Sequence, residues 1–300
     1  MANNEKENFV KNLKDGYITI KLQIYEKRIR QDKHSKEYIE LKMGDRTGTT
    51  TVRLFFEQTQ VQNIFDTCHK GDVLKLEGQY SDTYKSLSVN DPTKVYKCTP
   101  DDYRPEDFRC TCDKEPQVLM EEIKITIDNM QNTHLKTLLE TIFNDTKFVS
   151  KFMDAPSAMS MHHNYAGGNL EHTVGVLKIC KQISELYEVD ADLLFCGAIL
   201  HDIGKIRTYT FDKSMPTITD EERMISHVIV GDRMVHETIN KTFQDFPEDL
   251  KMQLSHLMLS HHGKNEWGSP VSPETPEAIA LHYADLLDSQ VKKALQRNAQ

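Results

Sequence analysis

The stretch GAILHDIGK, residues 197–205, places His201 and Asp202 side by side within a segment whose other members are nearly all apolar. Such an apolar run predicts a helix buried inside a domain. Burying an imidazole and a carboxylate is costly unless something compensates them. A divalent cation does so, because both groups are good ligands for iron, manganese, zinc and nickel. The stretch therefore predicts a metal site within a helical domain.

Apolar residues recur at helical spacing on both sides of this stretch. Stripes with steps of three and four run through residues 170–186, 224–239, 250–258 and 279–291. This spacing is typical of helices that bury one face. Residues 117–300 are therefore predicted to form an all-α domain.

Two further polar residues lie on these predicted helices, His172 on the first stripe and Asp285 on the last. A single histidine is more often a hydrogen-bonded structural residue, and a single aspartate on a helix is more often solvated. The combination of His172, the His201-Asp202 pair and Asp285 in one helical domain favours metal ligands instead.

Later histidines extend the predicted site. His227 shares a helix face with Met224 and Val228, and His261 continues the stripe that ends at Met258. Both are expected to face the core, either as ligands of a second ion or as hydrogen-bonded core residues. His262 is rotated by ~100° on the same helix and is the fallback ligand.

The first third of the chain alternates apolar and polar residues, as strands with one buried face do. The pattern occurs around residues 18–24, 39–43, 52–56, 74–76 and 87–89, with a helical stretch at 58–69. Five short strands with a helix between the third and fourth follow the order of an OB barrel. We expect an all-β OB-fold domain over residues 1–99, a proline-containing linker over 100–116, and the all-α domain after it.

Charge and cysteine usage narrow the class of protein. The net charge is −9, yet residues 17–98 carry more lysine and arginine than aspartate and glutamate, which suits a phosphate backbone. The cysteines are widely spread and predict free thiols, and the spacing of Cys110 and Cys112 is short for a zinc site. No stretch is apolar enough for a membrane span and the amino terminus lacks a secretory signal, so a cytoplasmic location is expected.

Several longer strings carry a family resemblance. They are HHNYAGGNLEHT (162–173), GAILHDIGK (197–205), SHHG (260–263), EWGSP (266–270), TPEA (275–278) and LHYAD (281–285). A His…His-Asp…Asp series in a helical setting resembles the HD phosphohydrolase superfamily. With an OB-like domain in front, the chain resembles the YhaM-type 3′→5′ exoribonucleases of Gram-positive bacteria. The resemblance is strong over residues 156–288 and weaker in the first third, where DRTG (45–48) fits.

The resemblance implies a metal-dependent 3′→5′ exonuclease that acts on single-stranded RNA, with single-stranded DNA as a further substrate. It implies two ions, with manganese favoured and iron, nickel, cobalt or magnesium as alternatives. The implied ligands are His172, His201, Asp202, His227, His261 and Asp285, and Asp202 bridges both ions.

The implied catalytic residues are Asp202 and Lys205. Two divalent ions activate a water for in-line attack on phosphorus and hold the scissile phosphate. Lys205, one helical turn beyond His201, is expected to steady charge on that phosphate. A solvated lysine at a helix end is the alternative.

In such a fold four further residues would border the metal cleft as substrate-binding residues, namely His163, Gly167, Gly168 and His262. Glycines let the main chain approach a phosphate closely, although the two glycines fit a tight turn before a helix equally well. Family members usually carry a glycine where this chain has Ser226, and residues 214–223 are unusually polar. These departures put substrate preference in question.

Single strands bind OB faces by stacking bases on aromatic side chains beside a basic groove. The candidates lie in and around two hairpin loops and on an outward strand face, namely Arg28, Arg30, Lys33, Tyr38, Arg53, Phe55, Tyr84 and Lys85. A solvated loop is the alternative for any one of them.

Two other functions stay open at this point. One is an HD hydrolase of small nucleotides, and the other is a non-catalytic OB-type nucleic-acid-binding module. Self-association into a homo-oligomer also stays open, and no membrane partner is expected.

Overall fold

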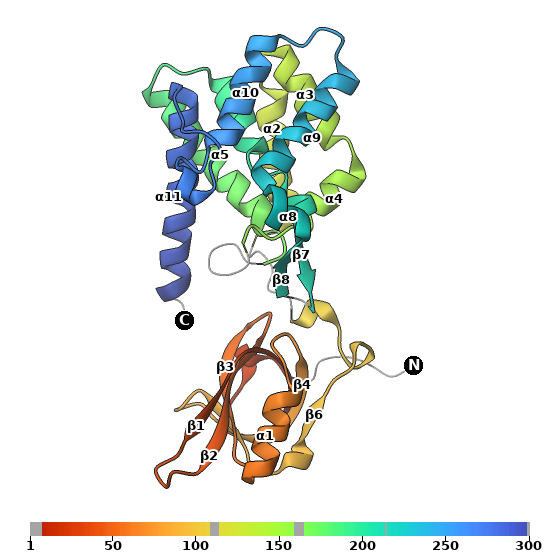
Figure 1. The fold of residues 1–300 in the computed structure, drawn as a ribbon, viewed down its shortest axis with the longest axis vertical. Helices are drawn as coiled ribbons and strands as arrows, with labels where there is room; N and C mark the ends of the chain where they lie inside the picture. The colour runs from red at the N-terminus through yellow and green to blue at the C-terminus, as the bar shows by residue number, and fades with distance from the viewer. Residues whose placement is uncertain (1–7, 109–113, 159–164, 214, 299–300) are drawn as a thin grey trace. The chain divides into compact units, whose positions relative to one another are not determined.

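The computed structural model describes residues 8–108, 114–158, 165–213 and 215–298 (Figure 1). By its internal contacts the chain divides into a strand-rich unit, residues 1–110 with 212–215, and a helical unit, residues 111–211 with 216–300. The expected strand-rich part followed by a helical part is confirmed. Among the described residues, no helix is both long and apolar enough to cross a membrane.

The strand-rich unit holds one sheet of six strands. In chain order they are β1 (Gly16–Gln31), β2 (Glu37–Asp45), β3 (Gly48–Leu54), β4 (Val73–Ser81), β5 (Ser86–Val89) and β6 (Val95–Lys97), with helix α1 (Gln58–Thr67) between β3 and β4. Their order in the sheet is β1-β2-β3-β5-β4-β6, and β1 also pairs with β4. The β3–β5 pair is parallel and the other pairs are antiparallel. The sheet is strongly curled (Figure 1), as the double pairing of β1 requires.

Strand β1 is longer than the alternation at residues 18–24 predicts. Its register against β2 shifts between Ile24 and Glu26, a β-bulge that bends the strand. The first half of the strand, Gly16–Gln23, pairs with β4, and the half from Gln23 to Gln31, which contains the bulge, pairs with β2. Of the basic residues expected in and around the first hairpin loop, Arg28 and Arg30 therefore lie on the strand itself.

One apolar core fills the strand-rich unit. Its fully buried members come from alternate positions of the strands and include Leu22, Ile24, Ile39, Leu54, Leu74, Leu76 and Leu87.

The part expected as a linker forms two short 3-10 turns, Pro100–Asp102 and Pro105–Asp107. Phe108 directly after them is buried, so this segment packs rather than running free in solvent.

The helical unit is built from ten helices among the described residues. They are α2 (Pro116–Asp128), α3 (Thr133–Phe143), α4 (Thr146–Asp154), α5 (Gly168–Leu186), α6 (Ala191–Leu200), α7 (Lys205–Thr208), α8 (Asp220–Ile225), α9 (His227–Thr242), α10 (Glu248–Ser260) and α11 (Pro276–Asn298). Two short strands, β7 (Tyr209–Asp212) and β8 (Met215–Ile218), pair between α7 and α8.

From Leu193 onward helix α6 consists of apolar residues and glycine, and neighbouring helices cover it. Its residues from Leu193 to Leu200 are buried except for the partly buried Phe195, and they share one core with α2, α3, α5, α9, α10 and α11. The helix starts where Asp190 accepts the main-chain N–H of Leu193, an N-cap that satisfies one of the unpaired donors of the first turn.

The expected stripe over residues 224–239 is wrong at its start. Ser226 has a φ of 74° and a ψ of 143°, a conformation that no helix contains, and it separates α8 from α9. Met224 is consequently 82% exposed, whereas Val228 is buried. The periodicity argument assumed one straight helix and so placed Met224 on the same face as His227.

The described cysteines, Cys68, Cys98, Cys180 and Cys196, are free thiols. Cys110 and Cys112 lie outside the described residues.

Candidate metal centre

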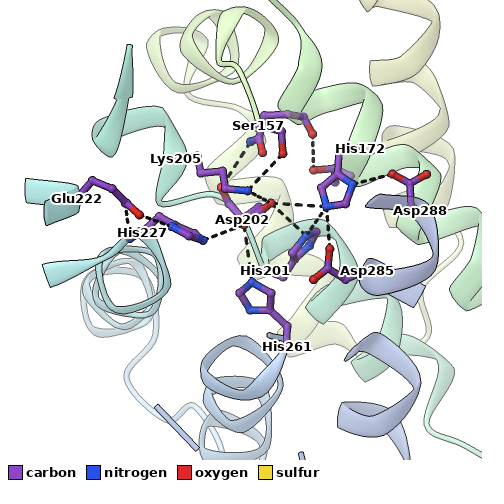
Figure 2. Close-up of polar contacts among 12 residues, drawn as sticks. Ser157, His172, His201, Asp202, Lys205, Glu222, His227, His261, Asp285 and Asp288 are labelled. Atoms are coloured by element: carbon purple, nitrogen blue, oxygen red, sulfur yellow. Dashed lines mark hydrogen bonds and ion pairs between the residues drawn. The ribbon is translucent and has the colours of Figure 1, made fainter. Parts of the chain in front are cut away.

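The six predicted metal ligands come from distant parts of the chain and lie together in the helical unit (Figure 2). His172 belongs to α5 and Asp285 to α11. His227 is the first residue of α9, and His261 directly follows α10. The site therefore exists only once these helices pack against one another.

The His201-Asp202 pair lies just beyond the end of a helix, not inside one as expected. Helix α6 ends at Leu200, and His201 is its C-cap. The chain then turns before α7, and a side chain at Gly204 would collide with the main chain of His227. The glycine of the HDIGK string thus lets this turn pack against the start of α9, which brings His227 close to Asp202.

The ligand atoms fall into two groups, each within 4.8 Å. One group contains His172, His201 and Asp285, and the other contains Asp202, His227, His261 and His262. In the first group, Nε2 of His172 lies 3.0 Å from Oδ1 of Asp285 and 3.4 Å from Nε2 of His201. His262, the fallback ligand in the sequence, stands in the second group with its neighbour.

Asp202 stands between the two groups. Its Oδ1 faces the second group, 3.4 Å from Nε2 of His227 and 3.8 Å from Nε2 of His261. Its Oδ2 faces the first group, 3.4 Å from Nε2 of His201 and 3.7 Å from Nε2 of His172. A carboxylate with one oxygen toward each group has the arrangement that bridging two ions needs.

Buried polar atoms without partners support a metal at this place. Oδ1 of Asp202 and the Nε2 atoms of His227 and His261 are buried and form no hydrogen bond with any described residue. Leaving such atoms unsatisfied costs ~1–3 kcal/mol each. A divalent cation would satisfy all three at once, so the donor set fits a metal.

The carboxylates are held in the form that binds cations. Burial alone would raise the pKa of Asp202, but Lys205 and His201 beside it hold that pKa well below its usual range. Burial would likewise raise the pKa of Asp285, and the hydrogen bond from His172 lowers it instead. Both groups are therefore ionised at neutral pH.

The histidines of the centre differ in their charge at neutral pH: His261 and His262 are neutral, whereas His172 is protonated. Burial and the neighbouring His262 lower the pKa of His261 well below its usual value, and burial with His227 lowers that of His262 to about 4. Both rings are therefore neutral at pH 7, as metal ligands must be. Burial would lower the pKa of His172, but Asp285 and Asp288 raise it to about 10, so a cation there must displace a proton.

Two of the histidine rings are oriented by main-chain carbonyls. Nδ1 of His201 lies 2.8 Å from the carbonyl oxygen of Ala198, and Nδ1 of His261 lies 2.6 Å from that of Met258. Each hydrogen bond leaves Nε2 directed into the centre, and the hydrogen bond fixes which ring nitrogen carries the proton.

Two other rings are oriented by carboxylates that the sequence did not single out (Figure 2). Nδ1 of His172 lies 2.7 Å from Oδ2 of Asp288, and Nδ1 of His227 lies 2.8 Å from Oε1 of Glu222. Asp288 is spaced three residues from Asp285, which places it on the same side of α11; that spacing was the one available signal. Nothing in the sequence points to Glu222 beyond the polar stretch around it.

Lys205 is buried beside the centre, which rules out the solvated helix-end alternative. Its Nζ lies 2.6 Å from Oδ2 of Asp202 and 3.2 Å from Oγ of Ser157. A cavity of about 220 Å³ opens at this point, lined by residues that include Lys205, His262, Trp267 and Asp285.

The predicted substrate-binding residues are only partly described. His163 lies outside the described residues. Gly167 has a φ of 79° and precedes α5, and Gly168 is its first residue, so this pair forms the turn that starts the helix carrying His172. His262 lines the cavity.

Five of the eight predicted nucleic-acid contacts lie on the outer side of β1, β2 and β3 or directly after β3. Arg30 is paired in register with Tyr38 across β1 and β2, and the rings of Tyr38 and Phe55 stack with centroids 5.0 Å apart. Arg30 and Arg53 both reach Glu40, at 3.4 and 3.6 Å. Five predicted residues share this surface, hereafter the β1–β3 face: Arg28, Arg30, Tyr38, Arg53 and Phe55.

The other three predicted contacts lie in turns. Lys33 is exposed in the turn between β1 and β2, and Tyr84 and Lys85 are in the turn between β4 and β5. Tyr84 is 74% exposed, and Lys85 pairs with Asp82 at 2.6 Å.

Comparison with known proteins identifies the family of this chain. The HD domain family model matches residues 169–290. The chain is also 32% identical over 291 residues to the 3′-5′ exoribonuclease YhaM of Shouchella clausii (strain KSM-K16), an alignment that covers 94% of this chain and 86% of the relative. The chain therefore belongs to the YhaM family of HD-domain proteins.

Proposed function

We propose that this protein is a metal-dependent 3′→5′ exonuclease that hydrolyses phosphodiester bonds of single-stranded RNA, with single-stranded DNA as a further substrate. The observation that carries the proposal is Asp202, whose two oxygens face two separate groups of metal-ligating side chains. The name of the Shouchella clausii relative supports the direction and the substrate class.

We propose that this ligand set holds two divalent ions. His172, His201 and Asp285 would hold one ion, His227, His261 and His262 the other, and Asp202 both. Divalent ions in such a pair supply Lewis acidity toward a phosphoryl oxygen and activate water. We favour manganese, with iron, nickel, cobalt and magnesium as alternatives that the donor set also accepts.

The chain's own residues supply the rest of the chemistry. Lys205 keeps a buried positive charge beside Asp202, where it can balance the added charge of an approaching phosphate. Ser157 holds the ammonium group from the other side. The cavity beside them is the place where a scissile phosphate would sit.

The strand-rich unit would hold the substrate strand. We assign it to the OB type, with a domain over residues 1–99 and a linker over 100–116, because a parallel β3–β5 pair and the return of β1 to β4 bring the curled six-stranded sheet toward closure. Stacked aromatics beside arginines on the β1–β3 face suit unpaired bases and phosphates. A cytoplasmic location and a homo-oligomeric state stay predictions.

Digestion of labelled oligonucleotides tests the proposal. With Mn²⁺ supplied, a 5′-labelled single-stranded RNA should yield a ladder that shortens from its 3′ end, and a 3′-blocked strand should resist. Turnover of mononucleotides without oligonucleotide degradation would favour the small-nucleotide hydrolase. Binding of oligonucleotides without any hydrolysis would favour the non-catalytic module.

A further inference from the structure

Glu222 holds His227 at two points. Its Oε2 accepts the main-chain N–H of His227 at 2.6 Å, and its Oε1 lies 2.8 Å from Nδ1 of the ring. The Glu222 side chain is only 12% exposed. Because α9 begins at His227, one carboxylate both caps this helix and orients the ring, whose Nε2 lies 3.4 Å from Oδ1 of Asp202.

The turn at Ser226 makes this double contact possible. Its φ of 74° ends α8 and redirects the chain into α9, so that Glu222 on α8 reaches the first N–H of α9. Helix α8 includes residues 220–223 of the polar stretch noted in the sequence. That stretch therefore has a structural role at the metal centre.

The other histidines of the same group lack such support. Nδ1 of His261 is paired with the carbonyl oxygen of Met258. Nδ1 of His262 is buried and forms no hydrogen bond with any residue that the structure describes. Within the described parts of the chain, Glu222 thus supplies the carboxylate behind this group of rings, as Asp288 does behind His172.

We propose that Glu222 is a positioning residue for the ion held by His227, His261 and His262, and that it sets the affinity of this ion separately from the other. The inference rests on the proposed two-metal function. A carboxylate that accepts the Nδ1 proton fixes the ring tautomer and makes Nε2 a stronger ligand. Loss of such a partner typically lowers metal affinity by ~10–100-fold.

The test is a Mn²⁺ titration by calorimetry on full-length protein stripped with a chelator. The wild type should bind two ions per chain. Glu222→Gln should keep one ion at wild-type affinity and bind the other ~10–100-fold more weakly. Hydrolysis by this variant should recover as the Mn²⁺ concentration is raised, a rescue that a purely structural defect would not show.

Two matched variants sharpen the result. Glu221→Gln removes the same charge from α8, but Glu221 pairs with Arg207 at 2.6 Å and not with His227, so both ions should bind as in the wild type. Asp288→Asn should weaken the ion held by His172 instead. If Glu222→Gln folds poorly, Ser226→Gly is combined with it in one protein to restore stability, because glycine adopts the positive φ of this turn without strain.

Three results would overturn the inference. Glu222→Gln binding both ions as tightly as the wild type would remove the positioning role. Equal weakening of both ions would show that Glu222 does not act on one site. A wild type that binds fewer than two ions would overturn the proposed function itself and this inference with it, and the wild-type titration separates that case from the other two.

Discussion

The metal centre and the β1–β3 face hold their polar side chains in opposite ways. In the helical unit His201, Asp202 and His261 are buried. The packing of the helices determines the position of each of these side chains. On the β1–β3 face, Arg30 and Arg53 share Glu40, and their side chains are 49% and 35% exposed. Exposed ion pairs contribute ~0.2–1 kcal/mol, whereas a buried group that loses its partner costs ~1–3 kcal/mol. We therefore expect the proposed hydrolysis to depend on a few buried groups, and the proposed strand binding to be spread over several exposed ones.

The strongest test of this contrast is Asp202→Ala. We expect it to abolish hydrolysis, because both ligand groups lose the carboxylate that joins them, while oligonucleotide binding stays measurable. It also leaves the buried ammonium group of Lys205 without its carboxylate, at a cost of ~3–5 kcal/mol in stability. Activity and binding are measured in parallel, with the exposed Asp245→Ala as control. Unchanged turnover would contradict the ligand assignment.

Metal removal should lower the stability of the helical unit and leave the stability of the strand-rich unit unchanged. Ions that bind only the folded state add ~2.7 kcal/mol per site when present at a hundredfold of their dissociation constant. We expect a chelator to lower the melting temperature and to increase amide exchange around the helix ends that carry the ligands. Equal loss of protection in β1, β2 and β3 would show that the two regions do not differ in this way.

Removing the stacked rings of the β1–β3 face should weaken the binding of RNA and leave the rate of hydrolysis unchanged. Base stacking on an aromatic ring is worth ~1–3 kcal/mol per base, so Tyr38→Ala and Phe55→Ala should each raise the dissociation constant for an RNA strand. The rate at saturating substrate should stay near that of the wild type. Tyr187→Ala, at an exposed tyrosine of the helical unit, is the control. A loss of maximal rate with unchanged binding would assign the face a different role.

The smallest expected effect is a gain in stability from Ser226→Gly. A non-glycine residue in this positive-φ region carries strain of ~1–3 kcal/mol, of which part is offset by the greater chain entropy of unfolded glycine. A net gain of about 1 kcal/mol should appear as a higher denaturation midpoint, with the same metal stoichiometry. Ser184→Gly, inside α5, should lower stability instead. No gain at position 226 would mean that the turn is not strained.

Several elements were predictable because their signals are local. Alternation marks buried strand faces, and steps of three and four mark α5, α9 and α10, since both periods arise from the geometry of a single element. The sequence-based predictions were wrong where a helix or strand is interrupted. The bulge at β1 and the break at Ser226 each change direction within what reads as one uninterrupted pattern.

By itself the sequence determined which side chains are available for metal chemistry, because imidazoles and carboxylates in apolar segments are conspicuous from their neighbours alone. Only the tertiary structure decided how they are divided: which of them face each oxygen of Asp202, that His262 stands with His261, and that Asp288 and Glu222 support the rings from behind. Most of those relations join residues that are far apart in the chain or lie on either side of a turn. Their distances depend on how whole helices pack, a property that no short window of sequence contains.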